Sequence, residues 1–284
     1  MRVCGNRFVE LADVNPLTSA PKVAAHPAYF GVVRRTIALS GLIGAVLAAT
    51  ALAAPADTVS LTLSPSKAGR RSTVHVLAQG PFPGVSGGAT SVVVDAARGF
   101  KADPRAVSVL CSAAQASARA CPAASQIGHG TIATHVTTSI GAGSGDYNIT
   151  ADSYLAPKQQ AGDIAGVVLL ASTQTATGPQ YFDTTGRLLK PASGPYGVEL
   201  RFDNFPAVQS PVPGVTLTAT VNSIELFAGA SRKVTTGTGK HRRTKTYSLF
   251  TNPPTCRRTW TGRFMAVFTT GTVTRTLTTA CTRR

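Results

Sequence analysis

The sequence predicts an all-β protein, an antiparallel β-sandwich with one short helix bracketed by two cysteines. Apolar and polar residues alternate over several short segments, which is the period of half-buried strands. Clusters of glycine and proline separate these segments, as turns do between the strands of a sandwich. One stretch of about nine residues has the composition of a helix. Together these observations favour a single all-β domain over residues 57–284.

Four segments show the alternation, and residues 164–170 form a continuous apolar run that predicts a more fully buried strand. Aromatic residues make up 6% of the chain. The core must therefore consist mainly of Val, Leu, Ile and Ala. The alternating apolar positions are Val59, Leu61 and Leu63; Val74, Val76 and Ala78; Val198, Leu200 and Phe202; and Val215, Leu217, Ala219 and Val221.

Turns, the helix and a final hairpin complete the expected fold. Glycine-rich and proline-rich turns occupy 80–88, 141–146 and 193–197. The helix is expected at 112–120, where it would span about two turns. A terminal hairpin is expected over 264–279, with its turn at Thr270-Gly271.

Residues 34–56 have the three-part layout of a signal peptide. Arg34 and Arg35 precede a moderately apolar segment that ends in small residues, as a cleavable signal requires. Cleavage is expected after Ala56, with Ala53 as the alternative. An uncleaved anchor is the competing interpretation, because about 18 apolar residues can just span a bilayer. We interpret residues 1–33 as an unstructured extension or a gene-model artefact, and expect a secreted or surface-held product with no membrane span after cleavage.

Four cysteines follow the predicted signal: Cys111, Cys121, Cys256 and Cys281. An even number outside the cytoplasm favours disulfides. We expect sequence neighbours to pair, because the first two cysteines bracket the short helix, and the two other pairings remain open. The spacings are not the close pairs of a structural zinc site, so no metal is expected.

The second pair fits the expected hairpin less well. A turn at Thr270-Gly271 would place Cys281 opposite Trp260 rather than opposite Cys256. A bulge or a bend before Trp260 would reconcile the pairing with the hairpin.

Two motifs resemble those of uncharacterised secreted proteins from high-GC actinobacteria. The first runs from Cys111 through nine residues to CPAASQIGHG at 121–130, and the second is TNPPTC at 251–256, followed by Trp260 and a final cysteine. The resemblance covers most of residues 57–284. It implies export and a disulfide-bonded β fold, and it brings no known activity or catalytic residues. In physical terms, the proline of the first motif ends the helix, its glycines turn the chain and a strand begins at Thr131.

No set of side chains in the sequence predicts a catalytic, metal or cofactor site. The glutamates of residues 57–284, Glu199 and Glu225, lie on separate predicted strands, whereas a glycosidase needs two carboxyls about 5–10 Å apart. His129 and His135 would lie about 20 Å apart on an extended strand. That separation is too large for the two rings to share one ion.

Positive charge concentrates near the end of the sequence. Residues 57–225 carry 11 Lys/Arg and 10 Asp/Glu, whereas residues 226–284 carry 12 Lys/Arg and no acidic residue. The densest part, at 231–245, is rich in glycine and threonine and predicts a hairpin loop or ribbon. Its candidate binding residues are Arg232, Lys233, Lys240, Arg242, Arg243 and Lys245.

These features predict a non-catalytic secreted or cell-envelope protein that adheres to anionic polymers through the basic segment. The expected partner is an anionic cell-wall polymer or polysaccharide, with no sequence-specific nucleic acid. A solvated loop in an alkaline protein is the plainer interpretation of the same charge. The alternative function is an extracellular hydrolase whose site is assembled from distant residues. A concave pocket that gathers Asp183, Glu199, Asp203 or a histidine would favour the hydrolase, and a protruding basic loop would favour adhesion.

Overall fold

The computed structural model describes residues 57–80, 82, 89–141, 144–175, 178–191, 194–203 and 217–283, the side chains of 175, 178 and 217–220 excepted. The expected extension 1–33, the expected signal peptide 34–56, most of the turn at 80–88 and the strand position Val215 lie outside these residues. Within the described ranges, no helix is long and apolar enough to cross a membrane.

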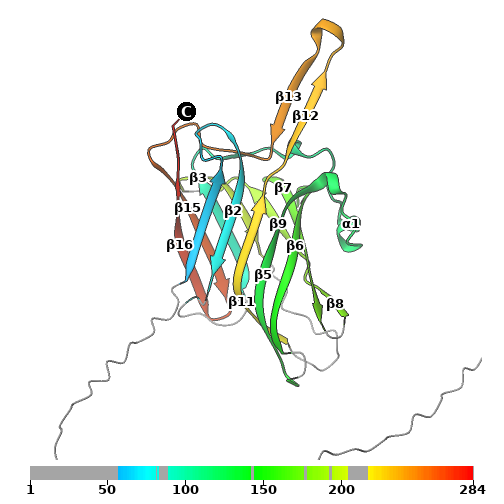
Figure 1. Ribbon diagram of the computed structural model, residues 1–284, viewed down its shortest axis with the longest axis vertical. Helices are drawn as coiled ribbons and strands as arrows, with labels where there is room; N and C mark the ends of the chain where they lie inside the picture. The colour runs from blue at the N-terminus through cyan, green and yellow to red at the C-terminus, as the bar shows by residue number, and fades with distance from the viewer. Residues whose placement is uncertain are drawn as a thin grey trace, which may run out of the picture. The chain divides into compact units, whose positions relative to one another are not determined.

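Fourteen of the strands formed by the described residues belong to one sheet, and two more form a separate hairpin (Figure 1). All the ladders pair antiparallel strands. The all-β, sandwich-like fold predicted from the sequence is therefore confirmed. In sheet order, the strands are β16 (Gly271–Ala280), β15 (Thr259–Phe268), β3 (Ala89–Ala97), β10 (Tyr196–Phe202), β9 (Thr184–Leu189), β7 (Asp163–Thr175), β6 (Gly145–Ala156), β5 (Gln126–Thr138), β11 (Leu217–Ala228), β2 (Arg71–Gln79), β14 (Phe250–Thr251) and β4 (Lys101–Ala102), with β1 (Thr58–Ser64) beside β2 and β8 (Gly178–Tyr181) beside β7.

The sheet curls until β1 and β16 lie side by side. The Thr279 hydroxyl of β16 donates a 2.5 Å hydrogen bond to the Leu61 carbonyl of β1. Just beyond the two strands, the Ala68 N–H donates to the Thr282 carbonyl at 3.0 Å. The two layers of the sandwich are therefore halves of one continuous sheet, and the core lies between them (Figure 1).

Inward-facing residues of the predicted strands form the core. Leu61 and Leu63 of β1, Ala78 of β2 and Phe202 of β10 are all at most 7% exposed. Val221 of β11 is half-buried and packs against the same core, and the side chains of its expected companions lie outside the described residues. Burial at every second position is the arrangement that the alternation predicts.

The continuous apolar run at 164–170 lies in β7, which is covered on both faces. Val167 and Leu169 join the main core, whereas Val168 and Leu170 pack on the outer side with Ala116 of the short helix α1 (Ala113–Ser117). A helix against the outer face explains why this strand is apolar on both sides.

The helix is shorter than the expected 112–120. Ser112 caps it, accepting a hydrogen bond from the Gln115 N–H while the Gln115 side chain accepts one from the Ser112 N–H. Arg119 has a positive φ of 52° and ends the helical geometry early. The disulfide between Cys111 and Cys121 closes this segment, as the sequence predicts.

The second disulfide joins Cys256 to Cys281, which confirms the other expected pair. The predicted register of the final hairpin, with Cys281 opposite Trp260, is wrong. The turn lies at 269–270 instead, so that Trp260 faces Thr279. Arg258, with a φ of 90°, supplies the bend before Trp260 that brings the two cysteines together.

The glycines of CPAASQIGHG do not turn the chain as expected. After the 3-10 turn η2 (Ala123–Ser125), strand β5 begins at Gln126, and Gly128 and Gly130 lie inside it. They face β11 at a point where the two backbones come close, and a β-carbon at either glycine would overlap β11. Their small size is therefore used for close strand packing rather than for a turn.

Candidate functional site

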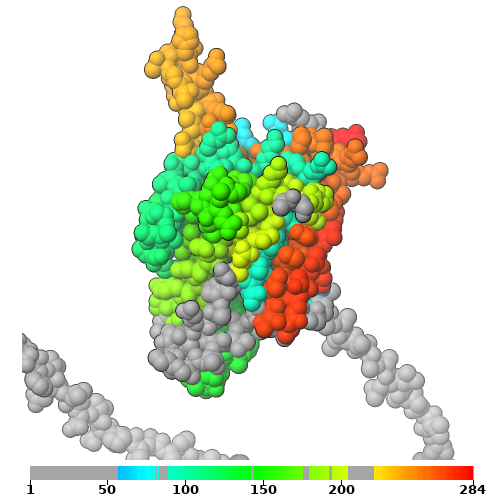
Figure 2. Space-filling model, turned by 180° about the vertical axis from the view of Figure 1, so that it is seen from behind, coloured from blue at the N-terminus to red at the C-terminus, as the bar shows by residue number. Residues whose placement is uncertain are grey.

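The predicted basic segment forms a hairpin of β12 (Ser231–Thr236) and β13 (Arg243–Ser248). The chain reverses through Gly237 and Gly239, whose φ angles of 82° and 53° favour glycine. A short 3-10 turn, η3 (Gly239–His241), completes the tip. The hairpin stands away from the main sheet in both views (Figures 1 and 2).

The candidate cations are spread over both faces and the tip of this hairpin. Tyr247 pairs with Arg232, Lys245 with Val234 and Arg243 with Thr236, so these side chains share one face. Lys233 pairs with Thr246 on the other face. The tip carries the remaining candidates, Lys240 and Arg242.

Five of the six candidate side chains are exposed, and Arg232 differs from them. It is half-buried, and its Nη1 donates a 3.1 Å hydrogen bond to the Val107 carbonyl. Arg232 therefore anchors the base of the hairpin. The exposed five are Lys233, Lys240, Arg242, Arg243 and Lys245.

The base of the hairpin rests on the 3-10 turn η1 (Pro104–Ala106). The guanidinium of Arg105 lies 4.6 Å from the ring centroid of Tyr247, and the Nζ of Lys245 lies 5.1 Å from the same centroid. Arg105 also binds Asp103 through two hydrogen bonds of 2.9 and 2.8 Å. These bonds, with a smaller contribution from Lys245, hold the pKa of Asp103 below its usual value. Arg105 thus pairs with the carboxylate beside the hairpin, and none of the exposed five forms an ion pair with a described carboxylate.

The structure adds a second group of cations that the sequence does not connect with the first. β13 leads directly into β14, which pairs with the start of β2 and with β4. Backbone hydrogen bonds tie the following loop, 252–258, to the loop between β1 and β2 and to the last residues described. These segments, with the connection between β3 and β4, form a platform beside the hairpin. The exposed cations of the platform are Lys67, Arg70, Arg71, Arg98, Lys101, Arg257, Arg258 and Arg283.

The remaining arginines of the described residues lie on or against the strands and are paired with carboxylates. Arg187 binds Asp163 at 2.8 Å and Arg263 binds Asp95 at 2.7 Å, and both acids have buried side chains. Arg119, Arg201 and Arg275 are likewise paired. Within the part of the chain that the structure describes, neither the platform cations nor the hairpin cations take part in an ion pair. Unneutralised positive charge thus gathers at one end of the sheet.

The acidic residues considered for a hydrolase each lie within 4 Å of an arginine among the described residues. Glu199, 5% exposed, accepts a 2.6 Å hydrogen bond from Arg201, which also lies 4.0 Å from Asp203. Asp183 pairs with Arg119. Four strands separate β10, which carries Glu199, from β11, which carries Glu225.

The two histidines considered from the sequence, His129 and His135, likewise contact different side chains. His135 contacts Asp146 at 2.8 Å, and His129 stacks on Phe227. Among the described residues, no group of three or more His, Cys, Asp or Glu side chains could hold a metal ion.

The cations of the hairpin are close in sequence and could be found as a charge cluster. Those of the platform come from four distant segments, and their only sequence signal is a recurrence of basic residues beside glycine and proline, as in KAGRR at 67–71. Comparison with protein families, with curated proteins and with solved structures finds no match for this chain.

Proposed function

We propose that this protein is a secreted or cell-envelope protein that binds anionic polymers through the basic hairpin. Two disulfides support a location outside the reducing cytoplasm. An anionic cell-wall polymer or an acidic polysaccharide is the partner whose chemistry fits. The platform cations extend the same surface and take part in the binding.

One observation carries this proposal. Five exposed cations stand on a hairpin that projects from the sheet, and no described carboxylate pairs with any of them (Figure 2). A projecting ribbon can lie along a polymer and reach several of its charges. Ion pairs with a linear polyanion release condensed counterions, which drives binding without requiring a specific sequence of units.

The arrangement favours polymer binding over recognition of one small anion. A pocket for a single phosphate or carboxylate would bring several donors to one point. Here the cations lie on two faces and the tip of the ribbon, with a second group on the platform. Such a surface suits a chain of repeated negative charges.

The test is the salt dependence of binding to heparin, used as a model acidic polysaccharide, by the full-length chain. Taking single-stranded nucleic acid as the reference, the five ion pairs of the hairpin contribute about −3.5 to the log–log slope, which is a loss of about 100-fold between 50 and 200 mM salt. Replacing Lys233, Lys240, Arg242, Arg243 and Lys245 with Gln should remove this contribution from the slope. The melting temperature should stay within about 2 °C, because these side chains are exposed.

A matched pair of variants separates local contact from net charge. Arg242→Gln with Arg243→Gln changes the charge as much as Lys158→Gln with Lys190→Gln, whose exposed lysines lie outside the hairpin. The proposal expects the hairpin pair to lose more affinity than the second pair. Equal losses in the two, or full retention by the five-residue variant, would overturn it.

A further inference from the structure

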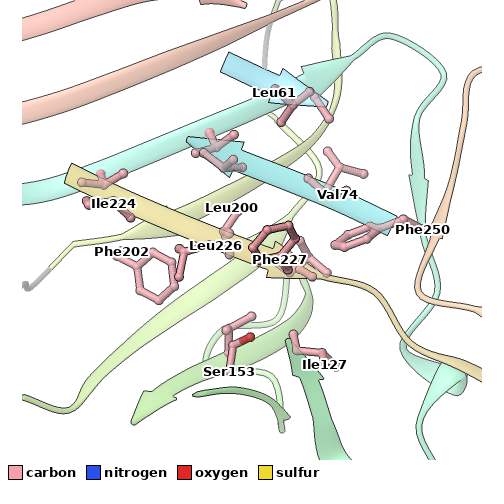
Figure 3. Close-up of a pocket in the computed structure, with 18 of the residues that line it drawn as sticks. Leu61, Val74, Ile127, Ser153, Leu200, Phe202, Ile224, Leu226, Phe227 and Phe250 are labelled. Atoms are coloured by element: carbon pink, nitrogen blue, oxygen red, sulfur yellow. The ribbon is translucent and has the colours of Figure 1, made fainter. Parts of the chain in front are cut away.

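The interior of the curled sheet contains a cavity of about 100 Å³ (Figure 3). Its lining comes from strands of both layers, including β2 and β11 on one side and β3 and β10 on the other. Among the 24 described residues that line it, Ser153 is the one with a polar side chain. The cavity is therefore almost wholly apolar.

The number of strands and the size of the side chains together explain the empty space. Eleven strands, from β1 round to β16, enclose this interior. A closed sheet of about eight strands has an interior that side chains just fill, so a sheet that closes with eleven strands leaves empty space between its side chains. Several inward positions hold alanine, among them Ala78, Ala96 and Ala228. Few aromatic side chains are present to fill the remaining volume.

The partial exposure of several lining side chains is further evidence for the cavity. Ile224 and Leu226 on β11 and Val94 on β3 point inward, at positions that alternate with outward-facing ones, yet they are only half-buried. Inward side chains of a filled core are normally fully buried, as Leu155 and Leu169 are here. Leu226 and Leu200, drawn from opposite layers in Figure 3, both border the open volume.

The polarity of the lining residues determines which kind of molecule the cavity can hold. A buried water needs two to four polar partners, and one serine hydroxyl cannot supply them. An engineered apolar cavity of about 150 Å³ stays dry and binds benzene. The present cavity is of similar size and chemistry. An apolar occupant would restore the contacts that its lining side chains lack.

We infer that the curled sheet binds a small non-polar molecule in this cavity, of the class of a benzene-sized hydrocarbon. This binding is separate from the capture of anionic polymers at the hairpin, because the cavity is lined by core side chains and the hairpin cations take no part in it. A polar or charged ligand is excluded from the site by the desolvation penalty.

The test uses benzene as the probe and the full-length chain. Saturating benzene should raise the melting temperature of the wild-type protein by several degrees, since it binds only the folded state. Val74→Phe places a larger side chain in the cavity and should abolish this rise. Leu77→Phe is the matched control, because Leu77 lies on the same strand, is also half-buried and does not line the cavity. It should keep most of the rise.

A measurement on wild-type protein alone covers the case in which Val74→Phe fails to fold. With methyl groups labelled for NMR, benzene should shift the methyl signals of Val94, Ile224 and Leu226 and leave those of Leu77 in place. No rise in melting temperature for the wild type, an equal rise in Val74→Phe, or methyl shifts confined to the exposed Val109 and Leu110 would overturn the inference.

Discussion

Gly130→Ala tests the close packing of β5 on β11. A β-carbon at this position would lie 2.6 Å from Cδ2 of Leu226 and 3.0 Å from its Cα, and it would overlap the Glu225 carbonyl oxygen. Ordinary contacts of a β-carbon begin near 3.4 Å. Two of these three obstacles are backbone atoms, so no side-chain rotation can relieve the overlap and β11 itself must move.

The expected loss of stability follows from this displacement of β11. Overpacking of a filled site costs about 1–3 kcal/mol. Gly130 pairs with Leu226 in the ladder, and pushing the strands apart weakens neighbouring hydrogen bonds that contribute about 1 kcal/mol each. We expect Gly130→Ala to lower the free energy of unfolding by about 3 kcal/mol. For a domain of this size that is a fall of about 6–12 °C in melting temperature.

The same substitution at an open position is the control. A β-carbon added at Gly162 would meet no atom within 4 Å beyond its chain neighbours, and the residue has no left-handed φ. Gly162→Ala should therefore leave stability unchanged or raise it by about 0.4–1 kcal/mol. Urea unfolding followed by circular dichroism measures both variants. A loss below about 1 kcal/mol for Gly130→Ala, or the same effect at both positions, would refute the close approach of the two strands.

Two further predictions concern covalent and ionic links. Replacing Cys256 and Cys281 with Ser should lower the free energy of unfolding by about 3.5 kcal/mol, and replacing Cys111 and Cys121 should lower it by about 2.7 kcal/mol. The first loss is larger because that disulfide closes the longer loop. Urea unfolding that gives the reverse order would contradict this explanation. The hydrogen bonds from Arg187 hold the pKa of Asp163 below its usual value, so the stability that this carboxylate contributes is complete above about pH 4 and is lost as the pH falls through its lowered folded value. The difference in unfolding free energy between wild type and Asp163→Asn should therefore shrink on acidification, and a difference that is constant down to about pH 2 would count against the ion pair.

The strands could be predicted from the sequence because alternation records burial at each position locally. Leu61, Leu63 and Ala78 face inward as expected. Strand order could not be predicted in the same way. β11 lies between β2 and β5, and β15 lies between β3 and β16. Most of these neighbours are far apart in the chain, and their pairing depends on contacts that no local pattern encodes.

The terminal hairpin shows how a local cue can mislead. Glycine at 271 suggested the turn, yet Gly271 begins β16 and has no left-handed φ. The turn uses two threonines instead. A shift of this kind moves every cross-strand pair, which is why Cys281 was expected opposite Trp260.

One part of the candidate site can be predicted from the sequence and the other part cannot. The hairpin could be located because its cations, glycines and threonines are adjacent in sequence. The platform could not, because Arg71 and Lys101 become neighbours only through their common pairing with Thr251 of β14. The cavity depends on the circuit of the whole sheet, so it has no sequence signal beyond the low aromatic content.

The central claim is that anionic polymers bind at the basic hairpin, and a heparin-fragment titration followed by amide NMR on the full-length chain tests it most directly. We predict shifts concentrated in residues 231–245, with smaller ones at 67–71 and 252–258, and all of them should fade as salt is raised from about 50 to about 200 mM. The residues at 139–141, in the connection between β5 and β6 at the opposite end of the sheet, should not move. Shifts centred on that connection, or no shift in the hairpin at low salt, would contradict the account.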